Sequence, residues 1–343
     1  MDMTNQEMLA RMQAAFKNIV DVDSLGKSVL QPAKFSRFVR MMQHKTVVLN
    51  EARFIEMDSD VVDIDRVGFV GRILRSGTKL NPVTGKYEHR TIKAGEETKP
   101  AFATNKLTAK ELQAVTGLKD KALRRNIERG NFEATLVDLF GEAAGRDLEE
   151  FAILADTDIS YGDDDVLSLT DGWIKLAGNK IYGKGTGKDF DATSKAWPEN
   201  MFDAMMAAMP KQYLRNEGEF RFYVDWEVRK AYIKLLKKRN TNLGDRAYVQ
   251  SGEMVPPYEG IPVRYVPAFN RSRSAEEGAA GKVALLSHPN NMAWGIFHTI
   301  SIEPDRIPRD RRTDFVLSFE GDAGYEDEDG AVAAFIQKEK PSS

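Results

Sequence analysis

The chain of 343 residues contains no cysteine, so disulfide bonds and thiolate metal ligands are excluded. No apolar run approaches the ~20 residues of a membrane-spanning helix. The first residues lack the basic start and apolar block of a secretory signal, and we expect none. These absences predict a protein with no membrane contact, suited to a reducing cytoplasm or to an assembly without covalent cross-bridges.

The chain also lacks an excess of either positive or negative charge. The chain has 49 basic and 52 acidic residues, for a formal net charge of −3. Such a balance gives no overall attraction to nucleic acid or membranes, although local patches remain possible. One patch, Lys234, Lys237, Lys238 and Arg239, could contact phosphates, but without a recognition motif a solvated helix face is the favoured interpretation.

Patterns for catalysis or metal binding are incomplete. Residues 178–185 resemble a phosphate loop, but Gly185 stands where magnesium binding needs Ser or Thr. Asp156, Asp158 and residues 163–165 are acidic but lack the glycine and distant glutamate of a calcium loop. Glu149 and Glu150 are adjacent, so we interpret them as a solvated helix face rather than paired carboxylates. We predict no catalytic residue, cofactor or metal; the alternative is a soluble metal- or nucleotide-dependent hydrolase.

The most regular stretch is residues 131–156, whose apolar residues recur at steps of three and four, as in a long amphipathic helix. Leu139 belongs to this apolar stripe. Gly141 and Gly145 weaken a helix, so we expect a close backbone contact on their side. We expect this spine helix to pack through Phe132, Leu136, Phe140, Gly141, Gly145, Leu148 and Phe151.

A second stretch predicts a long basic β-hairpin. Residues 61–73 and 89–103 are extended runs, and residues 80–86 between them, LNPVTGK, are a strong turn signal. A two-stranded hairpin of this length is unstable alone, so it must lie on its own domain or on a neighbouring copy of the chain. The residues expected to make such contacts are Arg72, Arg75, Lys79, Asn81, Lys86, Tyr87, Arg90 and Lys93.

The remaining elements indicate an α+β protein. We expect a strand over residues 45–57, a charged helical approach to the spine over residues 108–129, and a helix with a methionine-rich face over residues 198–214. Further expected elements are a helix at residues 225–239 and strands at residues 220–224, 260–266, 292–302, 315–319 and 331–336.

The order of these parts, together with residues 258–263 (YEGIPV), 285–295 (LLSHPNNMAWG) and 305–322 followed by 330–332, resembles the major capsid proteins of tailed bacteriophages. Their fold is the Hong Kong 97 (HK97-like) capsid fold, shared with encapsulins. The divisions that the resemblance implies are an N-terminal arm and first strand (1–57), an extended β-hairpin loop or E-loop (58–105), a peripheral domain with the spine helix (106–160), an axial domain (161–283), return strands of the peripheral domain (284–336) and a tail (337–343).

The resemblance implies a non-enzymatic subunit of an icosahedral phage head enclosing double-stranded DNA. The chain would then form hexamers and pentamers with itself, assemble in the host cytoplasm, and contact DNA without sequence specificity. Separate scaffolding, portal and decoration proteins are the other implied partners. An encapsulin-like compartment holding protein cargo is a second alternative.

Overall fold

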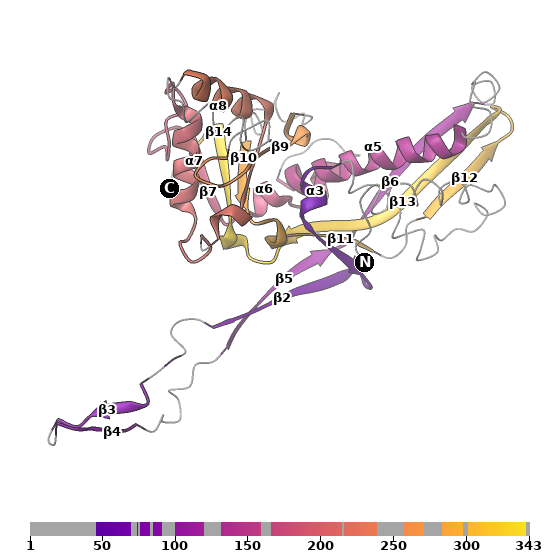
Figure 1. Ribbon diagram of the computed structural model, residues 1–343. Helices are drawn as coiled ribbons and strands as arrows, with labels where there is room; N and C mark the ends of the chain where they lie inside the picture. The colour runs from indigo at the N-terminus through magenta and orange to yellow at the C-terminus, as the bar shows by residue number, and fades with distance from the viewer. Residues whose placement is uncertain are drawn as a thin grey trace, which may run out of the picture.

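The computed structural model describes residues 46–69, 74, 76–82, 85–90, 100–119, 132–158, 166–214, 216–238, 257–270, 283–297 and 301–340. Most of the expected N-terminal arm, residues 1–45, lies outside this set. The described residues form two five-stranded sheets, a projecting two-stranded arm and three long helices. Figure 1 shows how the helices and sheets are arranged. The chain therefore has the expected α+β organisation.

The first sheet, here called the long sheet, is built around a strand of 14 residues, β13. Strand β13 pairs with β6 on one side and with β12 and then β11 on the other, while β1 runs parallel to β11. Its strands are β1 (Arg53–Met57), β6 (Lys110–Lys119), β11 (Met292–Phe297), β12 (Ser301–Ile307) and β13 (Arg312–Tyr325).

The predicted spine is confirmed as helix α5 (Phe132–Leu154), which has 23 residues and is about 35 Å long. It lies along the long sheet (Figure 1), and its buried Phe151 joins a core with Leu317 and Phe319 of β13. Leu139 is 61% exposed, so the prediction that it belongs to the packed stripe is wrong.

The second sheet, here called the compact sheet, has the order β7-β14-β10-β8-β9. Alternate residues of its strands point to opposite faces. Phe222 and Leu286 face helices α7 and α8, whereas Tyr223 and Leu285 join the core shared with α5 and the long sheet. The elements of this region are α6 (Trp173–Leu176), β7 (Asn179–Lys184), α7 (Trp197–Ala208), β8 (Arg221–Val224), α8 (Trp226–Lys238), β9 (Val263–Tyr265), β10 (Val283–Ser287) and β14 (Ala331–Glu339).

Short single turns connect these elements. They are the helix α3 (Val48–Glu51) and the 3₁₀ turns η2 (Val166–Ser168), η3 (Glu217–Glu219), η4 (Pro267–Asn270), η5 (Pro289–Asn291) and η6 (Glu328–Gly330). The helix expected over residues 198–214 is present as α7 but ends at Ala208. Its methionine-rich face is confirmed, because Met201 and Met205 are fully buried against the compact sheet.

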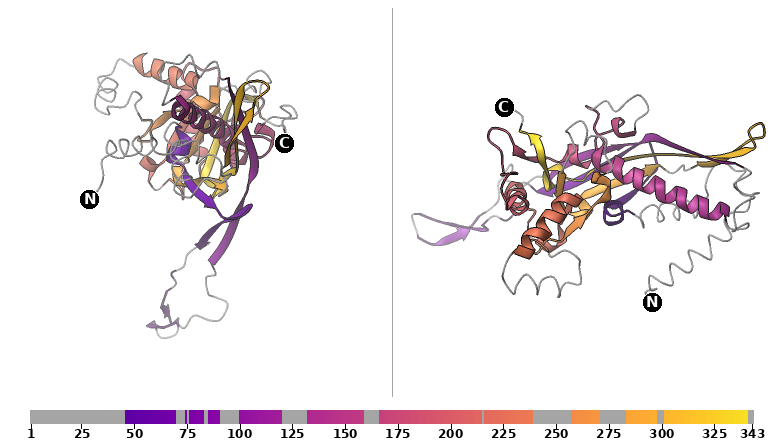
Figure 2. Two further views of the ribbon diagram at one scale, coloured as in Figure 1. Left: turned by 90° about the vertical axis from the view of Figure 1, so that its right-hand side faces the viewer. Right: turned by 90° about the horizontal axis from the view of Figure 1, so that it is seen from above.

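A two-stranded arm leaves the body where the two sheets meet (Figures 1 and 2). Strands β2 (Val61–Phe69) and β5 (Pro100–Thr108) pair along their whole length, from Val61 opposite Thr108 to Phe69 opposite Pro100. Farther out, β3 (Thr78–Leu80) pairs with β4 (Tyr87–His89). Only Ala109 separates β5 from β6, so one extended segment runs from the arm into the long sheet.

Three sequence expectations are corrected. Residues 48–51 form helix α3, so only Arg53–Met57 of the strand expected over residues 45–57 is a strand. Within the helix expected over residues 108–129, Lys110–Lys119 is instead strand β6, because pairing with β13 favours its alternation of inward Leu112 and outward Glu111. Residues 120–129 of that expected helix lie outside the described residues. Finally, β10 and β14 lie in the compact sheet, so residues 284–336 do not return as a block to the long sheet.

Candidate assembly surface

The distal hairpin of the arm presents one apolar and one charged face. Leu80 and Tyr87 are direct cross-strand neighbours, and they are 52% and 75% exposed. Lys79 and Glu88 pair on the opposite face. Two backbone hydrogen bonds close the tip. The Asn81 N–H donates to the Lys86 carbonyl, and the N–H of Gly85, which has φ +64°, donates to the Asn81 carbonyl. Exposed apolar side chains on an ordered hairpin are typical of a surface that another molecule covers.

The root of the arm, by contrast, is packed against the body. Ile64 of β2 and Leu107 of β5 are buried with Met57 and Ala293 of the long sheet. The Asn105 side-chain amide donates to the Tyr325 carbonyl at 2.9 Å. Burial of a leucine-sized side chain contributes about 2 kcal/mol, so the root is fixed while the tip has no core of its own.

Asp322 joins the arm root to both sheets. Its carboxylate accepts hydrogen bonds from the Thr108 N–H at 2.8 Å and from the Thr170 hydroxyl at 3.0 Å. Burial raises the pKa of Asp322, although these donors act in the opposite direction. Because Thr108 ends β5 and Thr170 precedes α6, one carboxylate of β13 connects the arm root to the segment before α6.

Asp327 forms a second junction close to the first. Its carboxylate pairs with the guanidinium of Arg66 on β2 and accepts a hydrogen bond from the Tyr213 hydroxyl, which follows α7. The Asp327 N–H donates to the Asn291 side chain at 2.8 Å. The arm is therefore tied to the segment that leads from the long sheet to the compact sheet.

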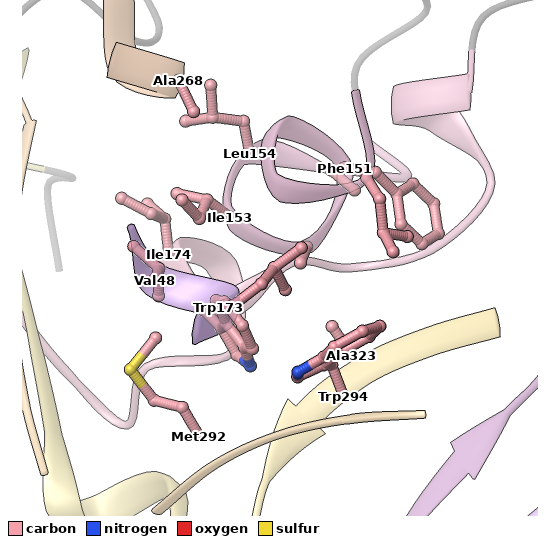
Figure 3. Packing of buried hydrophobic residues seen from close by; sticks show 14 of the residues in the cluster. Val48, Phe151, Ile153, Leu154, Trp173, Ile174, Ala268, Met292, Trp294 and Ala323 are labelled. Carbon is pink, nitrogen blue, oxygen red and sulfur yellow. The ribbon is translucent and has the colours of Figure 1, made fainter. Parts of the chain in front are cut away.

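Between the sheets, buried aromatic residues hold α6 against β13 (Figure 3). The Trp173 indole N–H donates to the Gly324 carbonyl at 2.9 Å, and the Tyr325 hydroxyl donates to the Trp173 carbonyl at 2.8 Å. Figure 3 shows Trp173 beside Val48 of α3, Met292 of β11 and Trp294. This shared core makes the two sheets one body from which the arm projects.

Helix α3 bridges the spine and the compact sheet through two carboxylates. Glu149 of the spine accepts hydrogen bonds from the N–H groups of Val47 at 2.7 Å and Val48 at 2.6 Å. Glu51 at the other end of α3 accepts a hydrogen bond from the Tyr223 hydroxyl at 2.8 Å and lies 3.5 Å from the Arg264 guanidinium. The point at which the N-terminal part of the chain enters the body is thus fixed from both sides.

Glu149 corrects a sequence interpretation. It was expected on a solvated helix face, but it is only 3% exposed. Burial raises its pKa, an effect that the backbone donors oppose. The periodicity of the helix does carry a signal for this position, since Glu149 lies four residues after the buried Gly145 and four before the buried Ile153. Its backbone partners, however, are about a hundred residues away.

The predicted site residues belong to the arm and to the spine helix. On the arm, Lys79, Lys86 and Tyr87 are exposed, Asn81 and Arg90 are half-buried, and Arg72, Arg75 and Lys93 lie outside the described residues. On the spine, Gly141, Gly145, Leu148 and Phe151 are buried and Phe140 is half-buried. Phe132 and Leu136 begin the helix, but their side chains are outside the described set.

The two sequence patterns that suggested a hydrolase form no site among the described residues, and residues 163–165 of the acidic pattern lie outside that set. Residues 179–184 are strand β7 rather than a phosphate loop. The Lys175 ammonium lies 2.7 Å from Asp156, 2.9 Å from Asp158 and 2.9 Å from Asp171, so a cation already neutralises the described aspartates of this pattern. These contacts raise the pKa of Lys175 despite its partial burial. Among the described residues, no three His, Cys, Asp or Glu side chains are placed to hold a metal.

Within the described part of the chain, no helix combines the length and apolarity needed to cross a membrane. The longest, α5, carries charged residues along its length.

Comparison with known proteins gives a relative over the whole chain. The chain is 30% identical over 337 residues to the prophage capsid protein YqbE of Bacillus subtilis (strain 168), covering 98% of this chain and 99% of that protein. No family model matches.

Solved structures show the same fold at low sequence identity. The satellite phage P4 procapsid, which includes the size determination protein, aligns with a TM-score of 0.61 at 12% identity, covering 98% of this chain and 99% of that chain. An empty GTA particle capsid and a structure from Mycobacterium phage Adephagia each align with a TM-score of 0.52 at 10% identity, covering 86% of this chain and 90% of theirs.

Proposed function

Because the chain belongs to the major capsid proteins of tailed bacteriophages, it is a structural subunit of a virion shell that assembles with itself, and we propose that its β-arm links neighbouring subunits. The observation that supports this role is the difference in burial between the root and the tip of the arm. Its root is buried in the body, whereas Leu80 and Tyr87 at the tip share an apolar face that is open to solvent. A neighbouring copy of the chain would cover that face.

The proposal extends to the arrangement of the shell. The long sheet with α5 would serve as the peripheral domain and the compact sheet as the axial domain, which meets its equivalents in hexamers and pentamers. Repeated interfaces in a closed symmetric shell provide strength without covalent links, in agreement with the absence of cysteine. The shell would be icosahedral.

We further propose that the shell encloses double-stranded DNA, assembles in the host cytoplasm, and has no enzymatic activity. Scaffolding, portal and decoration proteins would be separate partners. The pairing of Lys175 with Asp156 and Asp158 supports a structural role for these two carboxylates.

A deletion variant tests the linking role of the arm. Replacement of residues 70–99 by an Asn-Gly turn keeps the pairing of Phe69 with Pro100 and gives the ribbon a two-residue hairpin. We expect this variant to fold, with a melting temperature near that of the parent, but to form no closed particles in electron micrographs. Normal closed shells from the deletion variant would disprove the role.

A pair of double substitutions tests which face of the hairpin is covered. Leu80→Ser with Tyr87→Ser removes the apolar face, whereas Lys79→Ser with Glu88→Ser alters the opposite face of the same two strands. We expect the first variant to lose assembly and the second to retain most of it. Equal loss in both, or loss only in the second, would rule out the apolar face as the contact.

A further inference from the structure

Helix α8 carries a row of exposed residues that the fold does not use. Its core side contributes the buried Val228 and Tyr232. Trp226, Lys230, Lys234 and Lys237, at steps of four, four and three, are all exposed. Residues at these steps lie on one side of a helix. Three lysines and a tryptophan therefore form one exposed stripe, here called the α8 stripe, on the side of α8 opposite its buried residues. Helix α8 itself lies over the compact sheet (Figure 1).

Some of the described lysines are neutralised by described carboxylates of their own subunit, whereas the three lysines of the stripe are not. Lys175 contacts three aspartates, and Lys340 lies 2.7 Å from Asp189. Lys230, Lys234 and Lys237 have no carboxylate within ion-pair distance among the described residues. Their positive charge is consequently available to a molecule outside the subunit.

The N-terminal end of the stripe is held in a fixed arrangement. The Arg229 guanidinium lies 5.5 Å from the Trp226 ring centroid and 5.9 Å from that of Tyr265. The Trp226 and Tyr265 rings themselves are 5.5 Å apart at an edge-to-face angle of 69°. Even so, Trp226 is 49% exposed. An ordered, half-exposed tryptophan beside cationic side chains is typical of a contact surface rather than of a solvated helix face.

We propose that the α8 stripe binds the phosphate backbone of nucleic acid, and that α8 therefore faces the interior of the shell. The spacing supports this partner, because Lys230 and Lys237 are about 10 Å apart along the helix, and a duplex offers about one phosphate per 1.7 Å of its axis. Lysine acts as a point charge toward phosphate and reads no sequence. This inference rests on the proposed function, namely a shell that encloses DNA.

Titration of the full-length, unassembled chain with a fluorescent DNA duplex tests the stripe. The test variant carries Lys230→Gln, Lys234→Gln and Lys237→Gln. The control carries Lys180→Gln, Lys184→Gln and Lys211→Gln, three other exposed lysines with the same loss of charge. The plot of log affinity against log salt has a negative slope, whose magnitude should decrease by about 0.9 for each phosphate that the protein no longer neutralises. We therefore expect this magnitude to decrease by about 2 to 3 in the test variant and to stay almost unchanged in the control.

The outcomes distinguish a failure of the nucleic-acid proposal from a failure of the proposed shell function. Unchanged DNA affinity in the test variant, equal loss in the control, or no DNA binding by the parent chain would overturn the proposal, even if all three proteins form closed shells. Poly-glutamate serves as a second probe. Loss of poly-glutamate binding with intact DNA binding would reassign the stripe to an acidic protein segment and refute the nucleic-acid proposal.

Absence of cysteine allows a direct test of orientation, because Lys234→Cys introduces the sole thiol of the chain. A maleimide attached to a polymer too large to enter the shell is added before and after dissociation of closed particles. We expect protection in closed particles and labelling after dissociation. Equal labelling in both states would show that the stripe lies outside and would contradict the proposal.

Discussion

Glu149 in the spine helix accepts a hydrogen bond at 2.6 Å from the backbone N–H of Val48, a residue 101 positions earlier in the chain. The same carboxylate oxygen accepts the N–H of Val47. A single buried side chain thus satisfies two donors at the start of α3, where the chain enters the body. The contact stabilises the junction of spine and N-terminal segment, yet it requires a buried charge.

Two substitutions at Glu149 should therefore have different effects. Glu149→Gln keeps an acceptor oxygen and removes the charge, so we expect a change in unfolding free energy within about 1 kcal/mol. Glu149→Ala leaves the half-buried N–H of Val47 and the buried N–H of Val48 without this acceptor and should cost about 2–4 kcal/mol. Chemical denaturation of the unassembled chain measures both, and equal losses would argue against the acceptor role.

The pH dependence of this contact has a defined sign. Burial raises the pKa of Glu149 in the folded state, so the folded protein binds this proton more readily than the unfolded chain does. Its favourable contribution is complete below the ordinary carboxyl pKa and is lost as pH rises through the raised value. We expect the stability difference between the Glu149→Gln variant and the parent to shift toward the variant from acidic to neutral pH. A shift in the opposite direction, measured by thermal unfolding, would be inconsistent with a raised pKa.

Two leucines of the arm provide a comparison of root and tip. Leu107 is 1% exposed within the root cluster, whereas Leu80 is 52% exposed at the tip. Leu107→Ala should destabilise the unassembled chain by about 2–4 kcal/mol because it creates a cavity, while Leu80→Ala should change its stability by less than about 0.5 kcal/mol. Similar losses in urea unfolding would mean that the tip packs on the body of its own subunit.

A like-charge pair lies on the face of the long sheet away from α5. Glu111 of β6 and Glu320 of β13 are directly opposite each other, an arrangement that is unfavourable between strands. Glu320→Lys should place opposite charges across the strands and raise the unfolding free energy by about 0.2–1 kcal/mol. The gain should diminish in high salt. A loss of stability at low salt would refute this interpretation.

The sequence revealed those parts of the fold whose signal is local. The period of three and four in residues 131–156 predicted α5, and the turn signal at residues 80–86 predicted the hairpin of the arm. In each case neighbouring residues determine the structure. The resemblance of separated segments to phage capsid proteins then indicated the architecture, which the full-length relative and the solved structures support.

Features that depend on distant partners could not be predicted in the same way. The charged residues of β6 fit a helix until β13 supplies ten cross-strand neighbours. The buried role of Glu149 depends on Val47 and Val48, and the junctions at Asp322 and Asp327 depend on Thr108 and Arg66. Each is a contact between residues that a local pattern does not connect.

The account as a whole depends on what covers the tip of the arm, and electron cryomicroscopy of closed shells measures this directly. We expect the apolar face formed by Leu80 and Tyr87 to be buried against a neighbouring subunit in every ring position. A map in which that face remains in solvent, or folds back onto its own body, would contradict the linking role of the arm.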